Sequence, residues 1–197
     1  MVNFNVILFN DFETLDAFGP VEVIGKLPNA YHLRYHSTEG GIVKSSQQVL
    51  VDTLPVTEIE PSGILLIPGG MGTRTLVNDE YFIEQLKILS EKAPYVLTVC
   101  TGSALLAKTN LLNGMKATSN KMAFEWVMSN GTEVNWIKKA RWVKDGKFYT
   151  SSGVSAGIDM TLGFICDIHG MKASQAIANG IEYSWNPDRD NDPFAVE

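Results

Sequence analysis

Hydrophobic residues along the chain form short continuous runs, or alternate with polar residues, in the manner of β-strands. The predicted strands cover 2–10, 31–37, 63–67 and 95–99. The strand at 31–37 alternates between apolar and polar residues, which predicts one face toward solvent, whereas the other three are apolar enough for full burial. Two hairpins are also predicted, at 42–44 with 48–51 and at 140–144 with 147–150, the second around the turn dipeptide Asp145-Gly146.

Segments with apolar residues three and four positions apart lie between these strands and predict helices. The clearest is 78–92, which opens with an Asn-Asp cap and carries an apolar stripe on one face. Further helices are predicted at 15–24, 102–108, 121–128, 154–168 and 171–184. Because proline disrupts a helix interior, we place Pro20 in the first helical turn and expect Asp16 on the preceding loop.

Buried strands that alternate with helices indicate an α/β sandwich, a mostly parallel sheet covered by helices on both faces. The 197 residues suit a single domain, 1–197, with a polar tail at 186–197 that wraps the surface or frays. In such folds the chemistry lies at the carboxyl ends of the strands. Three positions are therefore candidates for one site: after residue 10, after residue 68 and after residue 99.

Composition and charge narrow the classes of partner. The chain carries 16 Lys and Arg against 22 Asp and Glu, a net charge of −6, without a basic run, so we expect no nucleic-acid partner. No apolar stretch approaches the roughly 20 residues of a membrane span, and no signal peptide is evident, which predicts a cytoplasmic protein without a membrane partner. No cluster of metal-ligating residues has a recognised spacing, so no metal or cofactor is expected.

Cys100 directly follows the predicted strand 95–99 and precedes a helix. A nucleophile at such a sharp turn is held out from the backbone, and the N-terminus of the helix favours the thiolate form. Free cysteines are also often buried as small apolar residues, but the place of Cys100 at a strand end favours a reactive thiol. Cys166 lies in the apolar stretch 154–168, and we expect it to be part of the core.

The segment 68–72, Pro-Gly-Gly-Met-Gly, ends another strand with glycines that expose backbone N–H groups. Such groups can hold developing negative charge, so we expect Gly69 and Gly70, together with Gly102, to position the substrate. The alternatives are a simple turn or a phosphate loop. The spacing matches neither the dinucleotide fingerprint nor the Walker motif, which leaves a nucleotide site weakly supported.

Asp16 follows the first strand, where a carboxyl group can act as a general acid or base with a pKa raised by burial. An aspartate near a helix start is also a common cap, and Glu13 is a nearby rival for the catalytic role. None of the three histidines follows Cys100, where Thr101 stands instead. The sequence around the turn therefore does not support a Cys-His hydrolase.

Four stretches resemble the DJ-1/PfpI (ThiJ) superfamily, which is related to class I glutamine amidotransferases. They are LDAFGPVEV at 15–23, LIPGG at 66–70, VCTGSALLA at 99–107 and SSGVSAGID at 151–159. The first and last are more specific, and they look like the branch that contains isonitrile hydratases and the amidase-like domains of AraC-type regulators. This resemblance implies a flavodoxin-like fold and a homodimer.

The resemblance also implies roles for residues: Cys100 as nucleophile, Asp16 as the interacting carboxyl group, and Gly70 as a backbone donor. Peptidase members carry His after the nucleophile, so Thr101 argues against peptidase activity, while isonitrile hydratases share the pairing of Asp with Cys-Thr. Many relatives have His where Asn120 stands in this sequence. An AraC-type regulator is disfavoured, because the α/β domain leaves no room for a helix-turn-helix module.

The resulting hypothesis is an isonitrile hydratase-like lyase that acts on a small-molecule substrate. The Cys100 thiolate attacks the terminal carbon of an isonitrile, Asp16 delivers a proton to that carbon, and Thr101 orients the acid or the water. Two alternatives stay open: a glyoxalase-like or deglycase-like enzyme acting on α-oxoaldehydes, and a redox or stress sensor in which Cys100 is oxidised.

Overall fold

A computed structural model describes residues 1–195 and contains an eight-stranded sheet with the strand order β3-β4-β2-β1-β5-β6-β10-β9. Its strands are β1 Val2–Ile7, β2 Tyr31–Ser37, β3 Glu39–Lys44, β4 Leu50–Pro55, β5 Ile64–Ile67, β6 Val96–Val99, β9 Trp142–Asp145 and β10 Phe148–Ser151. The strands from β4 to β10 in this order are parallel, and only the outer strands β3 and β9 pair antiparallel. Two short strands, β7 Lys116–Ala117 and β8 Asn135–Trp136, form a separate pair.

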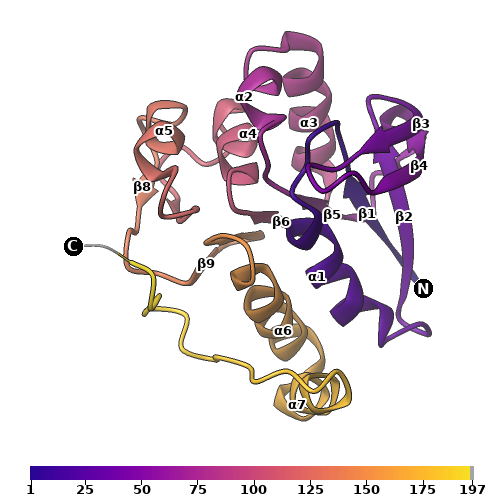
Figure 1. Cartoon of the computed structure of the whole chain (residues 1–197), viewed down its shortest axis with the longest axis vertical. Helices are drawn as coiled ribbons and strands as arrows, with labels where there is room; N and C mark the ends of the chain where they lie inside the picture. The colour runs from indigo at the N-terminus through magenta and orange to yellow at the C-terminus, as the bar shows by residue number, and fades with distance from the viewer. Residues whose placement is uncertain (196–197) are drawn as a thin grey trace.

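Helices cover the sheet on both faces, as Figure 1 shows. They are α1 Thr14–Gly25, α2 Thr73–Leu76, α3 Glu80–Lys92, α4 Gly102–Lys108, α5 Phe124–Ser129, α6 Ala156–His169 and α7 Met171–Gly180, with a 3-10 turn η1 at Val56–Glu58. Helices α2, α3 and α4 lie on one side of the sheet, and α1, α6 and α7 lie on the other (Figure 1). This arrangement confirms the flavodoxin-like α/β sandwich.

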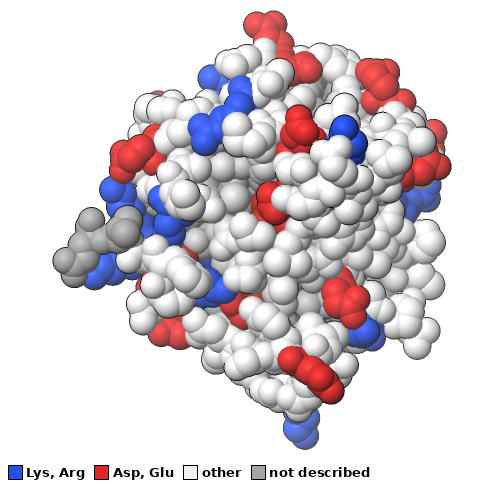
Figure 2. All heavy atoms as spheres, viewed as in Figure 1, with Lys and Arg blue, Asp and Glu red and all other residues white. Residues whose placement is uncertain are grey.

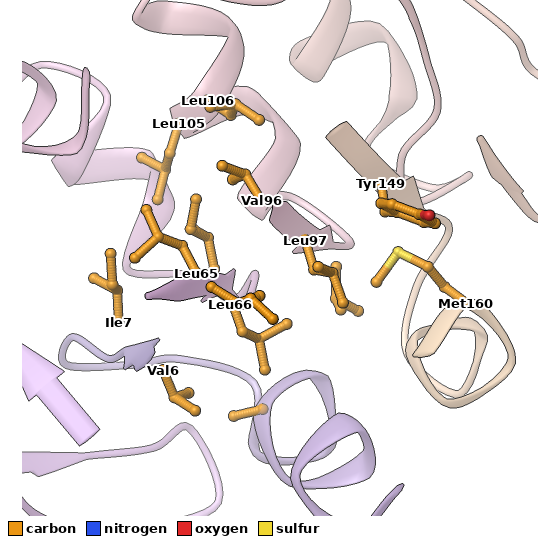
Figure 3. Packing of buried hydrophobic residues seen from close by; sticks show 14 of the residues in the cluster. Val6, Ile7, Leu65, Leu66, Val96, Leu97, Leu105, Leu106, Tyr149 and Met160 are labelled. Carbon is orange, nitrogen blue, oxygen red and sulfur yellow. The ribbon is translucent and has the colours of Figure 1, made fainter. Parts of the chain in front are cut away.

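The core is built around the central strands β5 and β6, in which every residue is buried. Leu65 and Leu66 of β5 lie at its centre, Leu105 and Leu106 of α4 cover one side, and Met160 of α6 lies on the other (Figure 3). Because the central strands are buried on both faces, their sequences read as continuous apolar runs rather than as an alternation. A rigid core thus supports the carboxyl edge of the sheet.

Helix α1 corrects one prediction. The helix begins at Thr14, so Asp16 lies in its first turn rather than on the preceding loop, and Pro20 lies in the helix interior. A proline there removes one helical hydrogen bond, but five of the other helical residues are buried against the sheet and α6. A Cβ atom at Gly157 of α6 would lie 3.5 Å from the Pro20 ring, which shows how closely the two helices pack. Tertiary packing outweighs the local cost of the proline.

The C-terminal segment wraps the surface over its described part, which ends at residue 195. It runs from α7 back to β9 (Figure 1), where the Arg189 carbonyl accepts hydrogen bonds from the backbone N–H groups of Arg141 and Trp142. Helix α7 ends at Gly180, four residues earlier than predicted, and the predicted tail residues 196–197 lie outside the described part.

Surface charge is mixed on the face shown in Figure 2, where acidic and basic side chains are interspersed. Among residues 1–195, no helix has the length and apolar character needed to cross a membrane.

Candidate functional site

The carboxyl ends of β1, β5, β6 and β10 bring the predicted site residues together. Asp16 on α1 accepts a hydrogen bond from the N–H of Gly69, which follows β5. The N–H of Gly70 donates to the Thr101 hydroxyl, next to Cys100 at the end of β6. These contacts join segments more than 30 residues apart in sequence, as expected where parallel strands end at one edge of a sheet.

Cys100 occupies a strained turn between β6 and α4. Its φ of 58° lies in the left-handed region, which costs a residue with a side chain roughly 1–2 kcal/mol. Serine residues hold this conformation: the Cys100 N–H donates to the Ser151 carbonyl, and the Cys100 carbonyl accepts from Ser103 Oγ at 2.9 Å and from Ser119 Oγ at 2.7 Å. The turn has the geometry of a nucleophile elbow, with only 7% of the residue exposed.

Asp16 is completely buried, and Oδ2 accepts from the Gly69 N–H at 3.0 Å. Its Oδ1 atom has no hydrogen-bond partner among the described residues. Burial raises the pKa of Asp16 from 3.8 to about 8, and the nearby charge of Glu13 adds to this, while the Gly69 N–H and the Cys100 thiol oppose it. At neutral pH this carboxyl group is therefore a neutral acid that can deliver a proton.

The pKa of the Cys100 thiol is raised well above its ordinary value, chiefly by burial and then by the negative charge of Asp16. The Thr101 N–H acts in the opposite direction. This corrects the expectation that the start of α4 favours a thiolate, because desolvation of the sulfur outweighs the donors around it. The resting pair at neutral pH is a thiol beside a carboxylic acid, so attack by the sulfur requires its proton to leave.

The backbone donors of the Pro-Gly-Gly segment are already engaged. The Gly69 N–H binds Asp16, and the Gly70 N–H lies 3.0 Å from Thr101 Oγ1, which also accepts from Thr73 Oγ1 at 3.1 Å. A Cβ atom at Gly69 would lie 2.6 Å from the Thr101 backbone nitrogen, so only glycine allows this close approach. In this arrangement Gly69 and Gly70 position the side chains of Asp16 and Thr101, instead of offering free N–H groups to a substrate.

Gly102 also serves close packing, because a Cβ atom there would collide with the Ile67 carbonyl at the end of β5. Glu13, the rival carboxylate, stands at the N-cap position of α1 without a capping hydrogen bond from its side chain, and it accepts a hydrogen bond from Gln47 Nε2 at 2.9 Å. That contact directs Glu13 toward the β3–β4 connection. Asp16, not Glu13, is thus the carboxyl group beside the thiol.

Two residues at the site were not predicted as part of it, Gly153 after β10 and Asn120 after β7. A Cβ atom at Gly153 would lie 3.2 Å from Cys100 Sγ and would collide with Asn120 Nδ2. Ser119 is the neighbour that binds the Cys100 carbonyl. The SSGVSAGID stretch includes Gly153, and the resemblance drew attention to position 120, where many relatives have His. A two-residue strand such as β7 leaves no periodic signal that places Asn120 beside the thiol.

The loops that carry Asn120 and Gly153 are held by buried ions. Arg141 Nε donates to Asp159 Oδ2 at 2.7 Å, and the same guanidinium binds Asp192 Oδ1 and Ser155 Oγ, each at 3.3 Å. Lys121 Nζ lies 3.7 Å from Asp192 Oδ2. This buried ion cluster connects the C-terminal segment to the loops on either side of the thiol.

Cys166 and two of the three histidines, His36 and His169, lie elsewhere in the fold. His36 is buried and binds the Pro55 carbonyl through Nδ1, while His169 Nε2 lies 2.7 Å from the Tyr31 hydroxyl. Cys166 is only half-buried on α6, which corrects the expectation of a core residue. Within residues 1–195, no three His, Cys, Asp or Glu side chains are grouped so that they could hold a metal ion.

Comparison with known proteins yields relatives and structures that share this fold. The chain is 29% identical over 188 residues to an isonitrile hydratase from Pseudomonas putida. The matched region covers 94% of this chain and 80% of that protein. It is 25% identical over 174 residues to the HTH-type transcriptional regulator CdhR from Pseudomonas aeruginosa. This second matched region covers 85% of this chain but 51% of the regulator.

Solved structures agree with the architecture. A THiJ/PfpI family protein from Pseudomonas syringae has a TM-score of 0.81 at 23% identity, over 94% of this chain and 76% of that one. Drosophila melanogaster DJ-1beta has a TM-score of 0.77 at 20% identity, over 93% and 99% of the two chains. The model of the DJ-1/PfpI family matches residues 3–166. The chain therefore belongs to the DJ-1/PfpI family.

Proposed function

We propose that the protein hydrates a small isonitrile to an N-substituted formamide, with Cys100 as the nucleophile and Asp16 as the general acid. The observation that carries this proposal is the neutral, fully buried Asp16 carboxyl group beside a thiol on a strained turn. The similarity to an isonitrile hydratase over 94% of the chain supports the choice of substrate class.

The chemistry of an isonitrile suits this pair because one carbon atom receives both the sulfur and a proton. The acid and the nucleophile must therefore reach the same atom. Asp16 protonates the terminal carbon while Cys100 Sγ bonds to it, and the thiol proton passes to the Asp16 carboxylate. The product of this step is a thioimidate, Cys100–S–CH=N–R, with Asp16 protonated again.

Water then completes the reaction. It adds across the C=N bond, with oxygen bonding to carbon and a proton to nitrogen, and gives Cys100–S–CH(OH)–NH–R. Breakage of the C–S bond returns the sulfur and a proton to the enzyme and releases the formamide. Thr101, held by the Gly70 N–H and Thr73, supports this step by orienting the water or the acid through its hydroxyl group.

The same pair of groups would serve an enzyme that acts on α-oxoaldehydes, and product analysis separates the two reactions. Oxidative sensing is less well supported, because oxidation requires thiolate character and exposure. Cys100 is 7% exposed, and its raised pKa keeps the thiol protonated.

The test is formamide production from para-nitrophenyl isocyanide by the wild type, Cys100→Ala and Asp16→Asn, followed by liquid chromatography and mass spectrometry. Glu22→Gln is the matched control, because Glu22 is an exposed carboxylate on α1 that pairs with Lys26. We expect turnover by the wild type and the control and none by the two site variants. A wild type that makes no formamide from this or other small isonitriles refutes the proposal.

A further inference from the structure

In the proposed reaction water adds across the C=N bond of the thioimidate, and the nitrogen that takes up the electron pair of this bond needs a hydrogen-bond donor. In most acyl-transfer sites backbone N–H groups fill this role. Here the N–H groups of Gly69 and Gly70 are engaged by Asp16 and Thr101, and the Thr101 N–H interacts with the sulfur itself. These three N–H groups are therefore already committed, which favours a donor from another segment.

Asn120 offers such a donor on the side of the thiol next to β10. Its Oδ1 atom accepts a hydrogen bond from the Ala123 N–H at 3.0 Å. Because only the amide oxygen can accept that bond, the NH2 group is turned the other way. It lies against Gly153, at a point where a Cβ atom would also come within 3.2 Å of Cys100 Sγ. The amide nitrogen thus lies on the side of Gly153 that also faces the sulfur, and the lack of a side chain at Gly153 allows this close approach.

The segment that carries Asn120 is fixed on both sides. Ser119 Oγ donates to the Cys100 carbonyl at 2.7 Å, which ties the segment directly to the nucleophile turn. Lys121 Nζ donates to the Ala140 carbonyl at 2.7 Å and to Thr118 Oγ1 at 3.1 Å. A donor held in this way does not need to reorganise during the reaction, which is the condition for strong electrostatic stabilisation.

We propose that Asn120 is a catalytic residue whose Nδ2 group donates a hydrogen bond to the substrate nitrogen or oxygen that is double-bonded to the carbon attacked at Cys100 and that gains negative charge when the double bond opens. Within the proposed function, on which this role for the hydration step rests, that atom is the nitrogen of the thioimidate. Addition of water gives Cys100–S–CH(OH)–NH–R, and Asn120 stabilises the nitrogen as the electron pair of the C=N bond moves onto it. Loss of the donor then slows hydration more than formation of the thioimidate.

The role can be tested without an isonitrile by comparing two reagents for Cys100. Acylation by para-nitrophenyl acetate develops an oxyanion on the attacked carbon, whereas alkylation by iodoacetamide displaces iodide from a CH2 group and develops none. The ratio of the two rates cancels changes in the reactivity of the thiol itself. Peptide mass spectrometry assigns each modification to Cys100 or to the half-buried Cys166.

Two substitutions remove the donor in different ways. Asn120→Asp keeps an acceptor for the Ala123 N–H but has no NH2 group, and Asn120→Leu is neutral and of similar size. Asn113→Asp is the matched control, because Asn113 is exposed and its Nδ2 binds Glu133 at 2.9 Å. We expect the ratio of acylation to alkylation to fall about 10-fold to 100-fold in both Asn120 variants and to stay unchanged in the control.

With an isonitrile, the same variants should accumulate the thioimidate on Cys100, which mass spectrometry detects as an adduct with the mass of the added isonitrile. An unchanged ratio in both Asn120 variants overturns the assignment, even if the wild type makes formamide. A wild type that makes no formamide refutes the proposed function alone, and the ratio of the two thiol reactions still decides the role of Asn120.

Discussion

Replacement of Asp16 by asparagine should stabilise the protein at neutral and alkaline pH while it abolishes activity. The pKa of Asp16 rises from 3.8 to about 8 on folding, chiefly because the carboxyl group is buried. The folded state therefore holds a proton that the unfolded state releases above pH 3.8. Stability from this group is fully present below pH 3.8 and is lost as the pH rises toward about 8.

The size of the effect follows from the width of that window. Each pKa unit corresponds to about 1.4 kcal/mol, so the loss across the window is on the order of 6 kcal/mol as an upper limit. Asparagine does not titrate, and its amide oxygen can still accept the Gly69 N–H. We expect Asp16→Asn to gain roughly 2–4 kcal/mol over the wild type between pH 4 and pH 8, because relaxation around the ionised carboxylate reduces the full value.

Urea unfolding of both proteins at half-unit intervals from pH 4 to pH 9 measures this difference, with Glu22→Gln as the control for loss of an exposed carboxylate on α1. Only the change with pH is diagnostic, since a constant offset reflects packing of the new amide. If the difference in unfolding free energy between Asp16→Asn and the wild type is the same at pH 4.5 and pH 8, Asp16 is not a neutral acid in the folded protein.

Three further predictions concern the site and its support. The rate of formamide production should fall as the pH rises through about 8, because Asp16 then loses the proton it must donate, and a kcat profile between pH 6 and pH 10 checks this limb. Gly153→Ala should lower kcat at least 10-fold, because its Cβ atom would collide with Asn120 Nδ2 and lie 3.2 Å from Cys100 Sγ. An unchanged kcat would show that the site has room for this methyl group. Asp192→Ala should destabilise the fold by about 3–5 kcal/mol, since it leaves the buried Arg141 with one carboxylate partner fewer. Thermal and urea unfolding measure this loss of stability. A loss below about 1 kcal/mol would show that the buried ion cluster is solvated.

Much of the fold and part of the site were predictable because the signals were local. Apolar runs identified the strands that end near Gly69 and Cys100, and the rule that parallel strands share a carboxyl edge placed these residues together. The position of Asp16 within α1 was predicted wrongly, because Pro20 indicates a helix start by local propensity while packing against α6 extends the helix past it.

Other features depend on contacts between distant segments and have no local signal. Asn120 reaches the site from a loop after a two-residue strand, and its amide is oriented by a backbone group three residues away. Asp192 binds Arg141 across 51 residues, in a segment whose polar composition indicates exposure. The engagement of the Gly70 N–H depends on the Thr101 side chain, which lies 31 residues further along the chain.

The left-handed backbone at Cys100 has a consequence for how stability and rate are related. The conformational cost of roughly 1–2 kcal/mol is met once, when the chain folds and the serine hydroxyl groups close around the turn. Each turnover then starts with the sulfur already presented, and no backbone rearrangement adds to the barrier. A substitution that lets this residue relax to a negative φ would therefore recover free energy in the resting protein and lose it again in the transition state.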